Sequence, residues 1–195
     1  MSHAHALHEA QADSNDVLGF WLYIMTDCIL FASLFATYFV LHHPNAYGPA
    51  LKPLIDLKYV LVETGFLLAS NFSFGMSILS SYRDNRRAVI GFLMLTFMLG
   101  ACFVGMEVYE FLHLAREGYN PTVSGAASAF FTLVGTHGLH VSFGLLWIAI
   151  MIIQLPIMGL NRITKKRLTY LGLFWNFLDI VWIFVFTFVY LMGAL

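Results

Sequence analysis

The chain has 195 residues, of which 59% are hydrophobic and only 11% are charged, and its formal net charge is −1. A soluble domain carries roughly 25% charged residues, so this chain has too few to cover a surface that faces water. With 10 Lys and Arg residues in total, it also lacks the basic patch that binding to nucleic acid requires. The composition therefore predicts a membrane protein.

The first 16 residues, "MSHAHALHEAQADSND", contain no Lys or Arg and no apolar core. They do not form a cleavable signal peptide, because such a peptide needs both. The histidines His3, His5 and His8 allow weak metal binding, but we favour a disordered polar tail over that alternative.

Five apolar blocks follow this segment, and each is long enough to cross a bilayer, which takes about 20 apolar residues. No long polar segment separates them. We therefore expect one transmembrane domain over residues 17–195, an all-α polytopic membrane protein built as a bundle of five transmembrane helices. The predicted spans are residues 17–40, 59–80, 88–112, 126–155 and 169–193.

Basic residues gather in the second and fourth of the four linkers. Cytoplasmic linkers carry an excess of Lys and Arg, so we expect these two linkers in the cytoplasm. With five spans, the N-terminus is then cytoplasmic and the C-terminus periplasmic. The three arginines of the second linker are also candidate contacts for lipid headgroups. The basic residues of the two linkers are Arg83, Arg86, Arg87, Arg162, Lys165, Lys166 and Arg167.

The two cysteines, Cys28 and Cys102, lie inside apolar blocks. They form no CxxC pattern, and no histidine lies at ligand spacing from either of them. We therefore interpret both as small buried residues and not as a disulfide or a zinc site.

Small residues recur every four positions in the second and fourth spans. At this spacing they share one face of a helix, and small residues allow membrane helices to approach closely. We expect these faces to pack inside the bundle, although contact with a partner chain is an alternative. The two ladders are Gly65, Ala69, Ser73 and Ser77, and Ser128, Thr132, Thr136, His140 and Gly144.

Seven ionisable residues lie inside the predicted spans, and no Lys or Arg lies at mid-depth to pair with them. An unpaired charge at the bilayer centre costs about 3 kcal/mol or more. We therefore expect the mid-depth carboxyls to be protonated and hydrogen-bonded to His, Thr, Asn or backbone groups. The aspartates and histidines fall at mid-depth and the glutamates in the outer third. The set is Asp27, Glu63, Glu107, Glu110, His137, His140 and Asp179.

Two interpretations of this set remain open. The residues can relay protons or bind an ion, or they can form polar bonds between helices that fix the bundle. We favour the second, because the spans show no broken helices of the kind found around transport sites. Thr26 lies beside Asp27, and Asn176 lies three residues before Asp179, so each aspartate has a polar neighbour.

The histidine pair His137 and His140 does not fit a haem or copper site. A bis-histidine haem in a bundle takes its ligands from facing helices, whereas both of these histidines lie on one span. Neither has a ligand-type spacing to a carboxylate. We therefore expect no metal ligand and no catalytic residue in this chain.

Several long stretches resemble one protein family. The stretches "FFTLVGTHGLHVSFGLLW" and "FWNFLDIVWIFVFTFVYLMG" look like the last two helices of subunit III of the haem–copper terminal oxidases. The stretches "GFWLYIMTDCILFASLFATYFVL", "VLVETGFLLASN" and "GMEVYEFLHL" resemble the elements before them. The resemblance runs from Gly19 to Gly193. The five-span form and "TDCILF" are similar to the quinol-oxidising bacterial branch of the cytochrome bo type.

This resemblance implies a subunit of a respiratory complex of the bacterial inner membrane. Such a complex oxidises ubiquinol, reduces oxygen to water and pumps protons, and its subunit I holds the haems and copper. The chain would then bind no redox cofactor, pack beside subunit I with subunits II and IV as further partners, hold phospholipids between its helices, and support assembly. In this family, the position of Asp27 is Glu in the cytochrome c branch, and Asn176 replaces a common His.

Two other functions remain open from the sequence. One is a stand-alone proton or ion transporter that uses the intramembrane Asp and His groups, and the other is a membrane cytochrome that binds haem itself. Haem absorbance and the identity of co-purifying chains would separate these three functions.

Overall fold

The computed structural model describes residues 2–41 and 57–191, and these residues are almost entirely helical. They contain no β-strand, so the prediction of an all-α fold is confirmed. A short π-helix, η1, directly continues the last α-helix. The elements are α1 (Ser2–Leu41), α2 (Leu57–Tyr82), α3 (Arg86–Arg116), α4 (Gly125–Met158), α5 (Arg162–Val185) and η1 (Phe186–Leu191).

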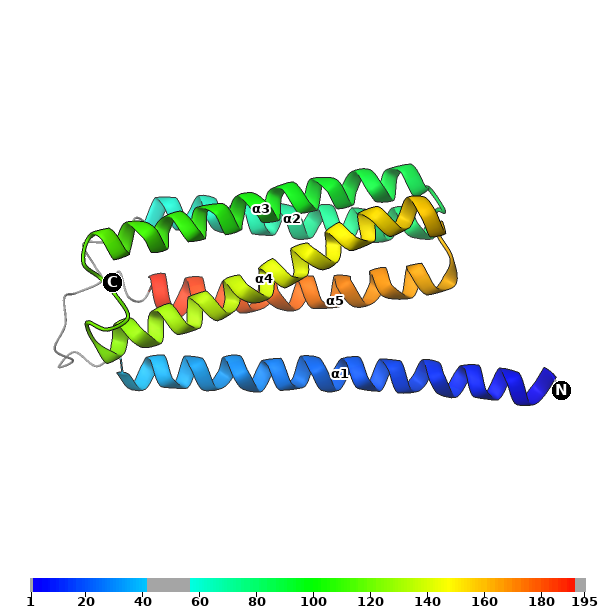
Figure 1. Cartoon of the computed structure of the whole chain (residues 1–195), viewed down its shortest axis with the longest axis horizontal. Coiled ribbons are helices and arrows are strands. Elements are labelled where there is room, and N and C mark those ends of the chain that lie inside the picture. Colours follow the sequence, from blue (N-terminus) through cyan, green and yellow to red (C-terminus); the bar gives the residue numbers. More distant parts are fainter. Residues whose placement is uncertain (1, 42–56, 192–195) are drawn as a thin grey trace.

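The helices form an elongated bundle in which successive helices run in opposite directions (Figure 1). Helix α4 crosses the bundle obliquely, from the side of α1 at its start to the side of α3 at its end. Helix α2 packs against α3 and α5, while α1 packs against α4 and α5. The turns at residues 83–85 and 159–161 lie at the same end of the bundle as the N-terminus.

Four segments are long and apolar enough to cross a membrane: Asn15–Leu41, Arg86–Arg116, Gly125–Met158 and Arg162–Leu191. The chain is therefore a multi-pass membrane protein. Helix α2 has 26 residues and thus the length of a span, but its many polar residues lower its hydropathy. The prediction that α2 is a fifth span stays a prediction.

The polar segment 1–16 is helical in the structure from Ser2 onward, where we expected disorder. It contains Ala, Leu, Glu and Gln, which favour helices, and no Gly or Pro. Adding residues to an existing helix also costs less than nucleating a new one. Helix α1 therefore extends well beyond the apolar block that marked the first span.

Tryptophans of α5 bind hydroxyl groups of α2 and hold the two helices together. Trp175 Nε1 donates a hydrogen bond to Ser70 Oγ over 3.1 Å, and Trp182 Nε1 donates to Thr64 Oγ1 over 3.0 Å. Both tryptophans are almost fully buried. Because an indole N–H left unpaired in a membrane interior is costly, these bonds set the register of α2 against α5.

The small-residue ladders pack inside the bundle only in part. Ser73 and Ser77 of α2 donate hydrogen bonds to the carbonyl oxygens of Phe92 and Val89 of α3, over 3.0 and 3.4 Å. Gly144 of α4 is buried against Trp175. The other ends of both ladders are exposed, so the prediction of internal packing is wrong for Gly65, Ala69, Ser128 and Thr132.

Both cysteines are exposed on the outside of the bundle, which corrects our interpretation of them as buried. The reason is that lipid is as apolar as a protein interior. A small apolar side chain in a span therefore gains little from burial, and its hydropathy does not reveal which way it points.

Replacing Gly144 by Ala should destabilise the protein. The added Cβ would lie 2.8 Å from the Trp175 ring and 3.3 Å from Phe174, and overpacking of this kind costs roughly 1–3 kcal/mol. Gly105→Ala is the matched control, because nothing lies within 4 Å of its added Cβ. We expect a lower thermal unfolding midpoint in detergent for Gly144→Ala alone. Equal midpoints for both variants would contradict this packing.

Candidate functional site

The seven ionisable residues predicted inside the spans are almost all buried. Six have low exposure, and His140 is partly buried. They do not form one site, because the structure distributes them over three places. These are the pair Asp27 and His140, the contacts of α5 with α2 and α4, which hold Asp179 and His137, and the three glutamates Glu63, Glu107 and Glu110.

Asp27 of α1 faces His140 of α4. Its Oδ2 lies 3.7 Å from His140 Nε2. His140 Nδ1 lies 2.7 Å from the carbonyl oxygen of Thr136, to which it can only donate a hydrogen bond. Nε2 is therefore the nitrogen that faces the carboxyl group. The expected neighbour Thr26 is exposed and donates to the Tyr23 carbonyl oxygen, so it is not the partner.

Asp179 of α5 accepts a hydrogen bond from Asn71 Nδ2 of α2 over 3.0 Å. The expected partner Asn176 is exposed and donates to the Gly172 carbonyl oxygen. Residues three positions apart differ by about 60° around a helix axis, which here places Asp179 inside and Asn176 outside. The polar partner therefore comes from another helix.

His137 is fully buried at the centre of the bundle. Its Nε2 lies 3.2 Å from the Leu178 carbonyl oxygen of α5. Its ring packs against Trp182 and Phe103, with ring centroids 5.1 and 5.9 Å away. In the described part of the chain, Nδ1 has no hydrogen-bond partner. This histidine fixes α4 against α5 through one bond and through aromatic packing.

The three glutamates meet between α2, α3 and η1. Glu63 is 0% exposed, Glu107 is 3% exposed and Glu110 is 7% exposed. The carboxyl group of Glu107 interacts electrostatically with those of Glu63 and Glu110. Tyr190 donates a hydrogen bond to Glu110 Oε2 over 3.0 Å. No side-chain oxygen of Glu63 or Glu107 has a hydrogen-bond partner among the described residues.

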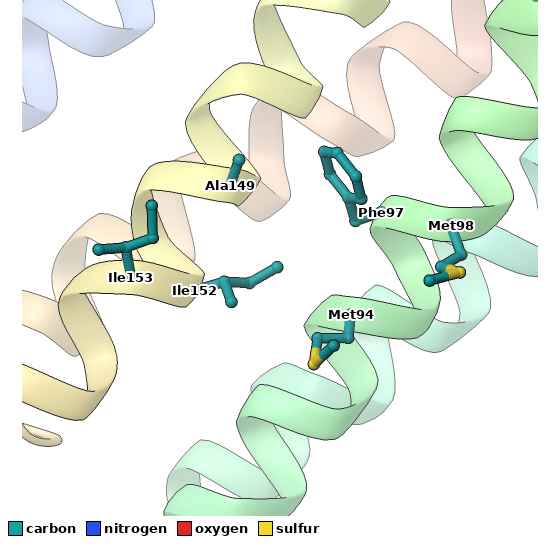
Figure 2. Close-up of a pocket in the computed structure, with 6 residues that line it drawn as sticks. All are labelled: Met94, Phe97, Met98, Ala149, Ile152 and Ile153. Atoms are coloured by element: carbon teal, nitrogen blue, oxygen red, sulfur yellow. The ribbon is translucent and has the colours of Figure 1, made fainter.

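Two pockets lie between α3 and α4, and they differ in chemistry. The first, of about 300 Å³, is lined by apolar side chains alone (Figure 2). The second, of about 210 Å³, is lined in part by Glu107, Gly138 and Ser142. Only the second brings a carboxyl group to its wall. The residues that line the first are Met94, Phe97, Met98, Ala149, Ile152 and Ile153.

The headgroup candidates Arg83, Arg86 and Arg87 are exposed at the end of the bundle that carries both basic turns. Arg86 donates a hydrogen bond to the carbonyl oxygen of Pro156, which joins the start of α3 to the end of α4.

Two ion pairs lie near this end as well. Lys165 Nζ is 2.6 Å from Asp84 Oδ1, and Lys166 Nζ is 2.8 Å from Asp16 Oδ2. The first pair joins the start of α5 to the turn after α2, and the second joins α5 to the helical extension of α1.

The described ranges 2–41 and 57–191 contain no group of three or more His, Cys, Asp and Glu residues placed to hold a metal ion. What these side chains offer chemically is hydrogen bonding and the binding of protons. Sequence reasoning missed Asn71 and Tyr190 as members of the polar sites. A lone amide inside an apolar span was an available signal for Asn71, whereas nothing in the sequence distinguishes Tyr190 from the other tyrosines.

Comparison with known proteins gives consistent results over almost the whole chain. The family model for cytochrome c oxidase subunit III matches residues 2–194. The chain is 54% identical over 188 residues to the cytochrome bo(3) ubiquinol oxidase subunit 3 of Pseudomonas aeruginosa, which covers 96% of this chain and 90% of that protein. It is 44% identical over 180 residues to the protein of the same name from Buchnera aphidicola, covering 92% and 93%.

Asp27→Asn should leave the protein folded and assembled, because the amide keeps a polar group 3.7 Å from His140 Nε2. Asp27→Leu places an apolar side chain against the partly buried imidazole, and leaving a polar group without a polar neighbour costs roughly 1–3 kcal/mol. We expect a lower yield and a lower thermal midpoint for Asp27→Leu alone, measured on protein purified in mild detergent. If Asn is disruptive and Leu is tolerated, a neutral carboxyl at this position is ruled out.

Proposed function

Because the chain belongs to the cytochrome c oxidase subunit III family, we propose that it is the non-catalytic subunit III of a haem–copper quinol oxidase. The observation that carries this proposal is the continuous match from residue 2 to residue 194. The relatives named as ubiquinol oxidase subunits also align over nearly their full lengths. The substrate of the complex is therefore a quinol, most simply ubiquinol as in the names of these relatives.

In this proposal the partner subunits perform the chemistry. Ubiquinol oxidation, oxygen reduction to water and proton pumping take place at the haems and copper of subunit I, and subunits II and IV complete the complex. The polar side chains of this chain support a structural role. The bonds from Trp175, Trp182 and Asn71 all join α2 to α5, as expected for a rigid scaffold. A stand-alone transporter is not favoured.

We place the chain in the bacterial inner membrane with residues 17–195 as one domain of five spans, α2 included. The positive-inside rule then puts the basic turns and the N-terminus in the cytoplasm. Support comes from the arrangement of the bundle, in which both basic turns and the N-terminus lie at one end (Figure 1). The C-terminus is then periplasmic.

Phospholipids are the proposed ligands of the outer surface. The apolar pocket between α3 and α4 suits an acyl chain, because its labelled side chains carry no nitrogen or oxygen (Figure 2). Exposed arginines at the basic end suit the headgroup phosphate. These are Arg83, Arg86 and Arg87.

The first experiment purifies the protein from its own membrane in mild detergent. We expect a haem-bearing chain and at least two further chains to co-purify, with the haem Soret band following the haem-bearing chain. When the chain is expressed alone, we expect no Soret band. A lone monodisperse protein that moves protons across liposomes would contradict the proposed function, and a stoichiometric haem on the lone chain would support a cytochrome instead.

A second experiment tests the lipid pocket. Ala149→Trp should fill it, so native mass spectrometry should detect one bound phospholipid fewer than in the parent protein. Leu146→Trp is the control, because Leu146 is exposed on the same helix and does not line the pocket. An unchanged lipid count for Ala149→Trp would exclude the pocket as a lipid site.

A further inference from the structure

The buried polar groups of this bundle divide into two kinds. Asp179, Trp175 and Trp182 each make a hydrogen bond to another helix. Glu63 and Glu107 make none through any of their four carboxyl oxygens within the described part of the chain. A carboxyl group whose role is to join helices would use these oxygens. The two glutamates therefore need a different explanation from the rest.

Their surroundings also exclude three simultaneous charges. The carboxyl groups of Glu63, Glu107 and Glu110 interact with one another, and Glu110 accepts a hydrogen bond from the neutral hydroxyl of Tyr190. Burying an ion costs several kcal/mol even when it is paired, and neighbouring carboxylates repel one another. Protons held within the cluster would remove this charge.

Glu107 places the cluster next to a pocket. It lines the second pocket between α3 and α4, together with Ser142 and residues of both helices. The pocket volume of about 210 Å³ is many times the roughly 15 Å³ that one water molecule needs. The two carboxyl oxygens of Glu107 are buried behind the pocket wall, so water in this pocket exchanges protons with them once the side chain moves toward the pocket.

Gly138 makes room for this carboxyl group. A Cβ built at Gly138 would lie 2.7 Å from both Oε1 and Oε2 of Glu107, closer than carbon and oxygen can approach. Only glycine allows Glu107 to lie against the backbone of α4 at this point. Gly135 lines the same pocket one turn earlier, and its added Cβ would make an ordinary 3.6 Å contact with Phe111.

We propose that Glu63, Glu107 and Glu110 form one acid cluster that binds protons together with water, and that exchanges them through the pocket between α3 and α4. The reaction is the addition of a proton from hydronium to a carboxylate oxygen, so charge and atoms balance without a further reactant. The cluster belongs to this chain alone, and the proposal stands whether or not the chain assembles into an oxidase.

Other titratable groups surround the cluster and enter its pH dependence. Tyr59 of α2 interacts with Glu63 and Glu110 but donates its own hydrogen bond to the Met106 carbonyl oxygen. Asp179 of α5 is bonded to Asn71. Tyr59 of α2 and Tyr190 of η1 interact with the cluster directly. Tyr109 of α3 interacts with Tyr59, and His137 of α4 precedes Gly138, which lies against Glu107.

Infrared difference spectroscopy tests the proposal on the protein purified with its co-purifying chains. Difference spectra between two pH values should contain the C=O stretch of protonated carboxylic acids, and this band should shift in D₂O because the acid protons exchange. The triple variant Glu63→Gln, Glu107→Gln, Glu110→Gln should lose the part of the band that the cluster contributes, whereas the part from Asp27, Asp179 and the co-purifying chains remains. Glu117→Gln is the matched control, because Glu117 is exposed in the turn after α3, and it should retain the whole band.

Single variants make the test independent of whether the triple variant folds. Glu63→Gln and Glu107→Gln should each remove part of the band and shift the pH midpoint of the remainder, because the carboxyls form one coupled site. Gly138→Ala should shift the band by displacing the Glu107 carboxyl, whereas Gly135→Ala should not.

Three results would overturn the proposal. The first is a band that none of the glutamine substitutions changes. The second is that, in each single variant, the band of the remaining glutamates keeps the pH midpoint of the parent protein, which would mean that the carboxyl groups titrate independently. The third is a band that is lost when sodium replaces choline in the buffer, which would mean that the cluster binds a metal cation in place of protons.

Discussion

The cost of an unpaired polar group in an apolar medium is the constraint on which this structure depends. Helix α2 carries more polar residues than its neighbours, and the structure pairs them with α5 and α3. The tryptophan N–H groups of α5 gain acceptors at the same time. The bundle is therefore held by a small number of directional bonds, with shape-complementary packing around Gly144 and Trp175 between them.

The same constraint gives different results at the two ends of the bundle. At the basic end the linkers are joined by ion pairs that water can reach, and such pairs contribute little each. In the glutamate cluster, Glu63 and Glu107 have no hydrogen-bond partner among the described residues, and we attribute their stabilisation to bound protons and solvent. Glu63 and Glu107 differ from Asp179 in that both of their carboxyl oxygens lack a hydrogen-bond partner among the described residues, whereas Asp179 accepts a bond from Asn71.

The sequence predicted the helices well but not their neighbours. The apolar blocks located all five helices. Helix α5 nevertheless begins at Arg162 and not at the predicted residue 169. Its first turns are rich in basic residues, so a search for apolar residues does not detect them. Hydrophobic periodicity places Asp179 on a face but cannot identify Asn71, 108 positions away, as its partner. The contact between Gly138 and Glu107 could not be predicted from the sequence either, since a glycine in a membrane span often serves only to let two helices approach closely.

The oblique course of α4 brings one helix to both polar sites. Helix α1 contacts α4 and α5, and its aspartate faces His140 of α4. Two residues earlier on α4, Gly138 lies against Glu107 of the acid cluster. A movement of α4 along its axis would therefore change the surroundings of both sites together.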